Sequence, residues 1–323
     1  MPIEVRKPGF ATTVQDRGRE GYYHVGVPPS GALDQRSLVA ANLLVGNPEG
    51  AAALECAYLG PELVFEEAGV VAVTGAELEP RLNGEARPRW ASFTVAAGDV
   101  LGFGHLKAGA RAYIAVAGGI DVPEVLGSRS TYGLGGLGGH EGRPLVAGDR
   151  LAAGSAGDGS GSEREVPADL WPALATRLEV RVVMGLYDHR LTALGRSTFL
   201  EADWALTPVA DRIGFRYRGP ALEMVQREQP FGAGSDPSNI VDAPYPIGSI
   251  QVPGGLEPIV LMRDAVSGGG YAMVATVISV DLDLVGQSAP GSTTRFVAVT
   301  LEEALEARAR RAEDSRALRE ALS

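Results

Sequence analysis

Apolar residues along this chain come in short runs that glycine and proline interrupt. The runs do not alternate regularly with helical segments, and this pattern favours barrels or sandwiches over a parallel sheet. The sequence therefore predicts a mainly β fold. The predicted strands are residues 70–74, 93–95, 111–117, 178–184, 213–217, 259–262, 271–280 and 294–299.

Two helices are predicted within the chain. Asp34 is placed to cap a helix over residues 35–45, with Leu33 and Leu38 as a hydrophobic staple. A second helix is predicted over about residues 188–199.

A third helix is predicted at the C-terminus. Thr300 and Glu303 have the spacing of a capping box, in which each side chain bonds the other residue's backbone N–H. We expect the apolar face of this helix to pack on the second half of the chain or on a partner. That face consists of Leu301, Ala304, Leu305, Ala309 and Ala312.

One segment has the composition of a flexible linker. Residues 153–165 are almost all small or polar and offer nothing to bury. We place the main boundary there, which predicts a first half over residues 1–152, a linker over 153–176 and a second half over 177–323.

A faint internal repeat connects the two halves. Gly60-Pro61-Glu-Leu is matched by Gly219-Pro220-Ala-Leu, and an apolar strand that starts at Tyr and ends near Asp occurs over residues 113–121 and 271–281. The spacing within the two copies is unequal. Chance similarity between β-strands therefore explains the pattern as well as duplication does.

Composition excludes several classes of partner. The chain has 323 residues, of which 45% are hydrophobic, so sizeable cores can form. Its 29 basic and 40 acidic residues give a net charge of -11, which argues against nucleic acid or an anionic membrane as partner. No apolar run approaches the roughly 20 residues of a membrane helix.

The cysteines and histidines of the sequence indicate the cellular location and whether a metal site is expected. Cys56 is the single cysteine and cannot form an internal disulfide, and the start of the chain lacks the features of a secretion signal, so a cytoplasmic location is expected. The four histidines are scattered and no paired cysteines occur, so no metal site is predicted.

The first candidate site lies near the N-terminus, over residues 12–19. Its hydroxyl, amide, carboxylate and guanidinium groups are of the kinds that bind a carboxylate, a ureido group or a phosphate. The alternative is that these groups form local turn bonds and surface ion pairs. The side chains are Thr12, Thr13, Gln15, Asp16, Arg17 and Arg19.

Three further segments carry candidate chemistry. Ser30 and Asp34 bracket a turn that leads into the first helix, whose N-terminus can attract an anion. Arg129 can bind a carboxylate or form a surface ion pair. The glycine-rich run over residues 133–142 has no Gly-Lys-Ser/Thr, so we interpret it as a mobile loop in which His140 and Glu141 are minor acid–base candidates.

A last candidate segment follows the predicted strand 259–262. Asp264 provides a carboxylate, Gly269 and Gly270 permit close approach of a ligand to the backbone, and Tyr271 adds a phenol.

Motifs over almost the whole chain resemble one family, subunit 2 of the allophanate hydrolase type, also known as the biotin-dependent carboxyltransferase family and as the C subunit of 5-oxoprolinase. The motifs are Thr12-Thr13-Val14-Gln15-Asp16-Arg17-Gly18-Arg19, Ser30-Gly31-Ala32-Leu33-Asp34, Asn42 to Pro48, Gly60-Pro61-Glu62-Leu63, Arg111 to Pro123, Leu126 to Thr131, Gly138 to Gly142, Asp211-Arg212-Ile213-Gly214, Gly248 to Pro253, Asp264, Gly269-Gly270-Tyr271, Asp281, Gln287 and Pro290-Gly291.

The resemblance implies a fold of two cyclophilin-like β-barrel halves with a few short helices and a C-terminal helix. It implies an enzyme subunit that is active only with partners: a separate subunit 1 and, for a 5-oxoprolinase, a third subunit. The reaction would be ATP-dependent opening of 5-oxoproline to glutamate, ranked first, or carboxyl transfer from carboxybiotin to a urea-like substrate. This chain has no recognisable cofactor motif, so ATP or carboxybiotin would come through the partners.

Family position and residue chemistry together predict roles for the candidate residues. Asp16, Asp264 and Tyr271 are the predicted catalytic residues. The predicted substrate-binding residues are Thr12, Thr13, Gln15, Arg17, Arg19, Ser30, Asp34, Arg129, Gly269 and Gly270.

One departure from the family pattern leaves other functions open. The family often continues Gly-Gly-Tyr with Pro and Lys, whereas this chain has Ala272 and Met273, so an ammonium group is absent at that point. One alternative is a non-catalytic regulatory partner of subunit 1, of the kind that antagonises a kinase inhibitor. The other is a scaffold whose ancestral site has decayed.

Overall fold

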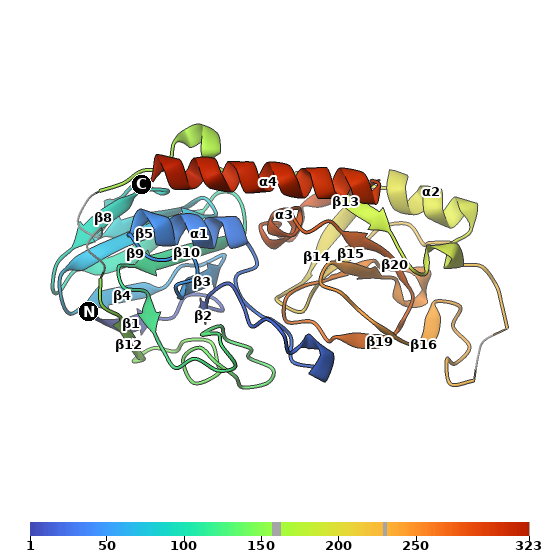
Figure 1. Cartoon of the computed structure of the whole chain (residues 1–323), viewed down its shortest axis with the longest axis horizontal. Coiled ribbons are helices and arrows are strands. Elements are labelled where there is room, and N and C mark those ends of the chain that lie inside the picture. Colours follow the sequence, from blue (N-terminus) through green and yellow to red (C-terminus); the bar gives the residue numbers. More distant parts are fainter. Residues whose placement is uncertain (157–162, 229–230, 323) are drawn as a thin grey trace. The chain divides into compact units, whose positions relative to one another are not determined.

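The computed structural model of the chain describes residues 1–156, 163–228 and 231–322, which form two compact units (Figure 1). Unit 1 comprises Met1–Glu20, Ser30–Leu174 and Glu313–Ser323, and unit 2 comprises Gly21–Pro29 and Ala175–Ala312. Residues 21–29 thus belong to unit 2, although the segments before and after them belong to unit 1. The end of the chain returns to unit 1 after residue 312.

Unit 1 contains two β-sheets. The first has the order β11 (Ile120–Asp121), β12 (Arg150–Ala153), β1 (Pro2–Lys7), β4 (Glu62–Phe65), β9 (Val100–Leu106), β6 (Leu78–Leu82) and β7 (Glu85–Ala86). The second has the order β2 (Thr13–Gln15), β3 (Ala53–Ala57), β10 (Arg111–Val116), β5 (Gly69–Gly75) and β8 (Ser92–Val95). All strand pairs of both sheets are antiparallel.

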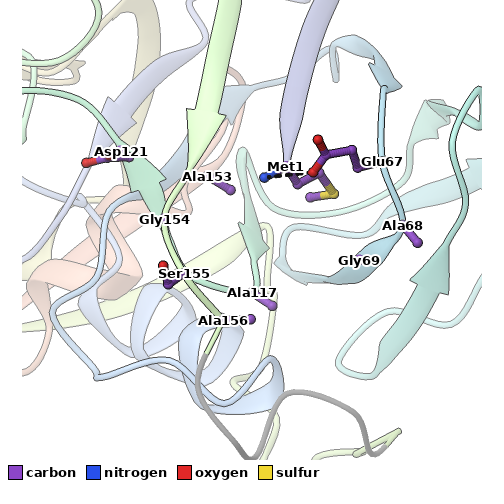
Figure 2. Close-up of a pocket in the computed structure, with 10 residues that line it drawn as sticks. All are labelled: Met1, Glu67, Ala68, Gly69, Ala117, Asp121, Ala153, Gly154, Ser155 and Ala156. Carbon is purple, nitrogen blue, oxygen red and sulfur yellow. Dashed lines mark ion pairs between the residues drawn. The ribbon is translucent and has the colours of Figure 1, made fainter.

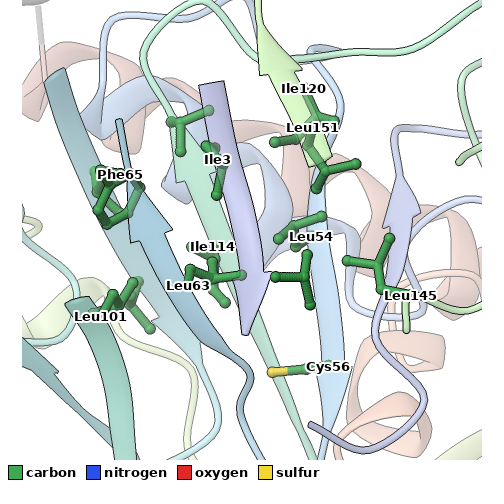
Figure 3. Close-up of a cluster of buried hydrophobic side chains, with 14 of the residues drawn as sticks. Ile3, Leu54, Cys56, Leu63, Phe65, Leu101, Ile114, Ile120, Leu145 and Leu151 are labelled. Carbon is green, nitrogen blue, oxygen red and sulfur yellow. The ribbon is translucent and has the colours of Figure 1, made fainter. Parts of the chain in front are cut away.

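The main core of unit 1 is built from strands of both sheets (Figure 3). Its side chains alternate along each strand, as Ile3 and Val5 do on β1, because successive residues of a strand point to opposite faces. Cys56 lies in this core, fully buried, and burial raises the pKa of its thiol to about 12. A thiol in such a place packs as a small apolar group and is not a nucleophile.

Helix α1 (Gln35–Leu44) covers the other face of the five-stranded sheet, against β5 and β10. It forms as predicted, because the carboxylate of Asp34 accepts a hydrogen bond from the backbone N–H of Ser37 at 2.9 Å. Leu38 and Leu44 bury their side chains on this face.

Residues 163–174 belong to the same layer as α1. Val166 is fully buried there, and the ring of Trp171 stacks on that of Trp90 at 5.9 Å. This segment, which the sequence assigned to a linker, therefore packs on unit 1 and includes a 3₁₀ helix, η2 (Ala168–Leu170). Residues 157–162 of the predicted linker lie outside the described residues, and the boundaries 1–152, 153–176 and 177–323 stay a prediction.

Unit 2 is a closed barrel. Its strand order is β13 (Arg177–Met184), β20 (Met273–Val277), β17 (Ser249–Gln251), β18 (Ile259–Leu261), β15 (Gly214–Arg218), β14 (Trp204–Ala210) and β21 (Thr293–Ala298). The parallel pair of β13 and β21 closes it. A separate antiparallel pair joins β16 (Asn239–Pro244) to β19 (Gly268–Tyr271). The remaining elements of unit 2 are η1 (Tyr23–Val25), η3 (Asp188–Arg190), α2 (Ala193–Glu201), η4 (Pro253–Gly255) and α3 (Leu282–Gly286).

The mainly β fold class, with a closed barrel and a C-terminal helix, is confirmed. Two predicted elements differ in detail. The strand expected over residues 271–280 is divided between β19 and β20. The helix expected from residue 188 begins only at Ala193, because Thr192 accepts a hydrogen bond from the Gly195 N–H and so caps α2 there.

The C-terminal helix α4 (Leu301–Ala321) starts at the predicted capping box. Glu303 accepts from the Thr300 N–H at 2.8 Å, and the Thr300 hydroxyl accepts from the Glu303 N–H at 3.1 Å. The predicted apolar face is not the buried one, however. Leu301 and Leu305 are 60% and 54% exposed, whereas Ala307, Leu318 and Leu322 are buried.

None of the helices in the described part of the chain is long and apolar enough to cross a membrane.

Candidate functional site

Asp16 is the centre of a hydrogen-bonded cluster in unit 1. Its carboxylate accepts from the backbone N–H of Gly18 at 2.8 Å and of Arg129 at 2.6 Å. It also accepts from the hydroxyls of Ser128, at 2.7 Å, and of Ser130. The carboxylate therefore ties its own turn to the loop over residues 128–130. We call Asp16 and these four donors the Asp16 cluster.

The neighbouring polar residues extend these internal bonds. The Gln15 amide donates to the Thr13 hydroxyl at 3.0 Å and to the Thr131 carbonyl at 3.2 Å, and its oxygen accepts from the Gly31 N–H at 3.1 Å. The Thr12 hydroxyl donates to the Pro8 carbonyl. The predicted binding residues Thr12, Thr13 and Gln15 are all buried.

The three predicted arginines differ in exposure. Arg19 is 1% exposed and donates to the carbonyls of Val125 at 3.0 Å and Ser130 at 2.8 Å. Arg17 has a side chain that is 57% exposed and pairs with Glu49 at 3.1 Å.

Arg129 lies in the same loop as the serine donors of the Asp16 cluster. It donates to the Val122 carbonyl at 2.8 Å and pairs with Glu124 at 2.6 Å. Its guanidinium also pairs with Asp121 at 3.7 Å, so residues 121–124 hold it.

The turn from Ser30 to Asp34 rests on a buried polar network. The Glu55 carboxylate accepts from the Leu33 N–H at 2.9 Å and from the Tyr113 hydroxyl at 2.7 Å. The same hydroxyl accepts from the Asp34 N–H at 2.8 Å. Burial, and next the charge of Glu55, raises the pKa of Tyr113 well above its usual value, so this phenol stays neutral.

The glycine-rich run packs tightly against the Asp16 cluster, in contrast to the mobile loop expected. Gly138 has a φ of +64°, and a Cβ there would lie 2.2 Å from the Ser130 carbonyl oxygen. Only glycine fits this position.

The two acid–base candidates of this run, His140 and Glu141, lie beside a salt bridge. Arg143 binds the Asp149 carboxylate at 2.8 and 2.9 Å and Glu141 at 2.7 Å. His140 Nε2 is 3.5 Å from Asp149. The hydrogen bond from Arg143, followed by that from the Val146 N–H, lowers the pKa of Asp149 to about 2.

In unit 2 the predicted catalytic residue Asp264 also has a carboxylate that accepts hydrogen bonds from a neighbouring side chain. Asp264 accepts from Arg212 Nε at 2.9 Å and from Nη2 at 3.1 Å, and its N–H donates to the Arg212 carbonyl. Both side chains are largely buried. This pair fixes the turn that precedes β19.

Tyr271, at the end of β19, is held through its backbone. The Tyr245 hydroxyl donates to the Tyr271 carbonyl and accepts from the Tyr271 N–H, both at 2.7 Å. A Cβ at Gly269 would lie 2.8 Å from the Tyr245 ring, so that glycine permits the contact. The Tyr271 residue is 41% exposed.

The Ala272-Met273 departure lies in the interior of unit 2. Ala272 and Met273 are 0% and 2% exposed. The residue in the position of the family lysine thus packs inside the barrel wall.

Unit 2 also contains a pocket of about 500 Å³. Its walls come from η1 and from the segments around β16 and β19. The Tyr23 hydroxyl donates to the Tyr245 carbonyl at 2.7 Å and to the Val266 carbonyl at 3.2 Å. The lining residues, which we call the Tyr23 pocket, are Tyr23, His24, Pro244, Tyr245, Pro246 and Ser267.

Sequence reasoning missed every residue of this pocket. A signal was present in two places: aromatic residues stand between Gly21 and Pro28, and Tyr245 stands between two prolines. Aromatic side chains present large flat apolar faces and are enriched at interfaces.

A second cavity, of about 470 Å³, lies in unit 1 (Figure 2). Small residues form most of its wall, and the charged groups are the Met1 ammonium, Glu67 and Asp121. It contains none of the predicted site residues. Within the described parts of the chain no cluster of His, Cys, Asp and Glu is arranged to hold a metal ion.

Comparison with known proteins shows the class of this chain. Residues 25–298 match the family model described as the carboxyltransferase domain, subdomain A and B. The C subunit of the Escherichia coli 5-oxoprolinase is 37% identical over 306 residues, which cover 95% of this chain and 94% of that protein. The chain therefore belongs to the carboxyltransferase-domain family that includes this 5-oxoprolinase component.

Two larger proteins contain a similar region. The urea amidolyase of Lachancea kluyveri is 36% identical over 314 residues, which cover 94% of this chain but only 17% of that protein. The crystal structure of the Kluyveromyces lactis urea carboxylase superposes with a TM-score of 0.91 at 34% identity, over 98% of this chain and 29% of that one. The chain thus spans less than a third of these relatives.

Proposed function

We propose that this chain is the carboxyltransferase-domain subunit of a 5-oxoprolinase, which opens 5-oxoproline to glutamate in an ATP-dependent reaction. One observation carries the proposal: the similarity to the E. coli 5-oxoprolinase component extends over nearly the full length of both chains. Subunit 1 and a third subunit would be its partners, and ATP would reach the reaction through them.

The substrate would bind in unit 2, where the described residues combine an exposed phenol, an accessible backbone and a pocket. Tyr271 would orient the substrate, and Gly269 and Gly270 would let it approach β19. Asp264 would support the site indirectly: its ion pair with Arg212 would fix the turn that precedes β19. In unit 1 the Asp16 cluster would hold its loop in place, and Arg17 would offer an exposed guanidinium to a carboxylate.

The test is reconstitution of the complex from this chain and the subunits encoded beside it. Formation of glutamate from 5-oxoproline and ATP is measured with each component omitted in turn. We expect product only when this chain is present. Asp264→Asn and Arg17→Ala should each slow the reaction, and unchanged turnover in both variants would refute the roles given to these residues.

A urea-type carboxyltransferase is the second candidate, and the TM-score of 0.91 with urea carboxylase supports it. In that case carboxybiotin carried by a partner would be the carboxyl donor. The same reconstituted complex would then consume carboxybiotin with urea and leave 5-oxoproline unchanged. A stable complex that turns over neither substrate would favour the regulatory alternative.

A further inference from the structure

A further cavity, of about 160 Å³, lies in unit 1, and the described residues that line it are all charged. It contains none of the site residues predicted from the sequence, and it shares no lining residue with the two cavities described above. We call it the Lys107 cavity. Its lining residues are Glu77, Glu79, Arg87, Arg89 and Lys107.

The pairing of β6 with β9 brings a carboxylate and an ammonium group to this cavity. Beyond the end of the paired strands, the Glu77 N–H donates to the Ala108 carbonyl at 2.7 Å and the Lys107 N–H donates to the Glu77 carbonyl at 2.9 Å. Glu79 lies two positions further along, and the side chain of Leu78 between them is buried on the other face of the sheet. The backbone therefore fixes which charges face the cavity.

Arg89 is held at the cavity by neutral groups. Its Nη1 donates to the carbonyls of Gly75 at 3.4 Å and Ala76 at 3.3 Å. The guanidinium carbon lies 5.6 Å from the centre of the Trp171 ring, at the distance of a cation–π contact. A guanidinium has five N–H donors, so these contacts leave donors for a ligand.

The opposite charges of the cavity do not pair with one another. Among the described residues, no ion pair joins a cation of the lining to a carboxylate of the lining. Arg87 and Glu79 pair instead with residues outside the lining, with Glu85 at 3.4 Å and with Arg81 at 2.7 Å. Such pairs at the surface contribute little stability. Charges of both signs that line one space without contact match a ligand that carries both signs.

We propose that the Lys107 cavity binds an acidic amino acid, which is a small molecule with two carboxylates and one ammonium group. The three cations and two carboxylates of the lining complement these groups in sign. The ligand carboxylates would bind Lys107 and the two arginines, and its ammonium would bind Glu77. A dianion without an ammonium would place a like charge beside Glu77. The assignment rests on these charges and not on the proposed function.

The test uses the full chain alone, isotopically labelled, in an NMR titration with three probes. L-Aspartate is the expected ligand, succinate has the same two carboxylates without the ammonium, and L-alanine lacks the second carboxylate. L-Aspartate should bind most tightly and shift the backbone amides of Glu77, Arg89 and Lys107. Equal affinity for L-aspartate and succinate, or no shift at these amides, would overturn the proposal.

The two lysines of the chain provide a matched pair of variants. Lys107→Met removes the ammonium of the cavity, whereas Lys7→Met removes an exposed ammonium that pairs with Glu62. Lys107→Met should weaken L-aspartate about fivefold, the upper range of one exposed ion pair. Lys7→Met should leave the affinity unchanged, and equal effects of the two variants would contradict the proposed site.

Glu77→Gln tests the group that would hold the ligand ammonium. The variant should weaken L-aspartate and strengthen succinate, because it removes an attraction to the first probe and a repulsion of the second. A merely structural role of Glu77 would instead weaken both probes alike. That result would refute the assignment of the ammonium to Glu77 and with it the choice of an amino acid.

These experiments are separate from the proposed function, because L-aspartate is neither the substrate nor the product of the proposed reaction. Binding of L-aspartate by the free chain together with an inactive reconstituted complex would refute the 5-oxoprolinase alone. An active complex whose free chain does not bind L-aspartate would refute the Lys107 cavity alone.

Discussion

The Asp16 cluster of unit 1 and the Tyr23 pocket of unit 2 both contain side-chain hydroxyls but use them differently. Around Asp16 the donors and the acceptor satisfy one another, and the side chains of Asp16, Ser128 and Ser130 are buried. Around the Tyr23 pocket the hydroxyls bind backbone, while ring faces, a serine and a histidine remain at a cavity. A dense polar motif is therefore evidence of a site only when its groups still have capacity for a ligand.

The largest expected effect of a single change tests the unit 1 side of this comparison. Asp16→Ala leaves two hydroxyls and two N–H groups without their buried acceptor, and should lower the free energy of unfolding by about 3–4 kcal/mol. Chemical denaturation measures it. Asp169→Ala, at an exposed carboxylate, is the control and should change stability by less than about 0.5 kcal/mol. Similar values for the two variants would mean that the Asp16 carboxylate does not stabilise the fold.

The next test asks whether the Asp264 carboxylate of unit 2 also stabilises the fold. Asp264→Asn removes the charge from a largely buried pair with Arg212 and should cost about 2 kcal/mol. The matched control is Asp203→Asn, in an ion pair with Arg177 that is exposed and should contribute at most about 1 kcal/mol. If Asp264→Asn left stability intact, Asp264 would belong with the ligand-binding groups.

A third test concerns the salt bridge between Arg143, which follows the glycine-rich run, and Asp149. The folded pKa of about 2 lies below the value of about 3.9 in an unfolded chain. The carboxylate therefore contributes stability above about pH 4, and this contribution of about 1–2 kcal/mol is lost as the pH falls toward 2.

Asp149→Asn removes that contribution. Native chain and variant should differ in free energy of unfolding at pH 6 and converge near pH 2. A difference that is constant with pH would mean that the salt bridge does not form in solution.

How much of the structure can be predicted from the sequence depends on how far apart in the chain the interacting residues lie. The Asp34 cap and the Thr300–Glu303 box were predictable because both involve residues three positions apart. The short strands were predictable from their apolar runs, and their pairing into a closed barrel followed from the family resemblance. The buried face of α4 was not predictable, because apolar residues lie on more than one side of this helix. Which side is buried depends on the elements that pack against the helix.

The candidate site shows the same limit. The sequence indicates which residues carry chemistry, but whether Asp16 is saturated depends on serines more than 100 residues away. The Tyr23 pocket depends on the transfer of residues 21–29 to unit 2, which brings Tyr23 to Tyr245 across 222 positions. Local pattern predicts neither of these long-range contacts.

The smallest stability effect is expected at Tyr271, and it provides the sharpest contrast with Asp16. Its side chain is exposed, and its position is set by backbone bonds to Tyr245 that a phenylalanine would keep. Tyr271→Phe should therefore change the free energy of unfolding by less than about 0.5 kcal/mol. It should nevertheless lower turnover of the reconstituted complex about five- to tenfold, since the lost hydroxyl would orient the substrate. Tyr132→Phe, in unit 1, is the control and should alter neither quantity. A variant that lost stability but kept full turnover would place Tyr271 with the anchors and leave the unit 2 site without its proposed phenol.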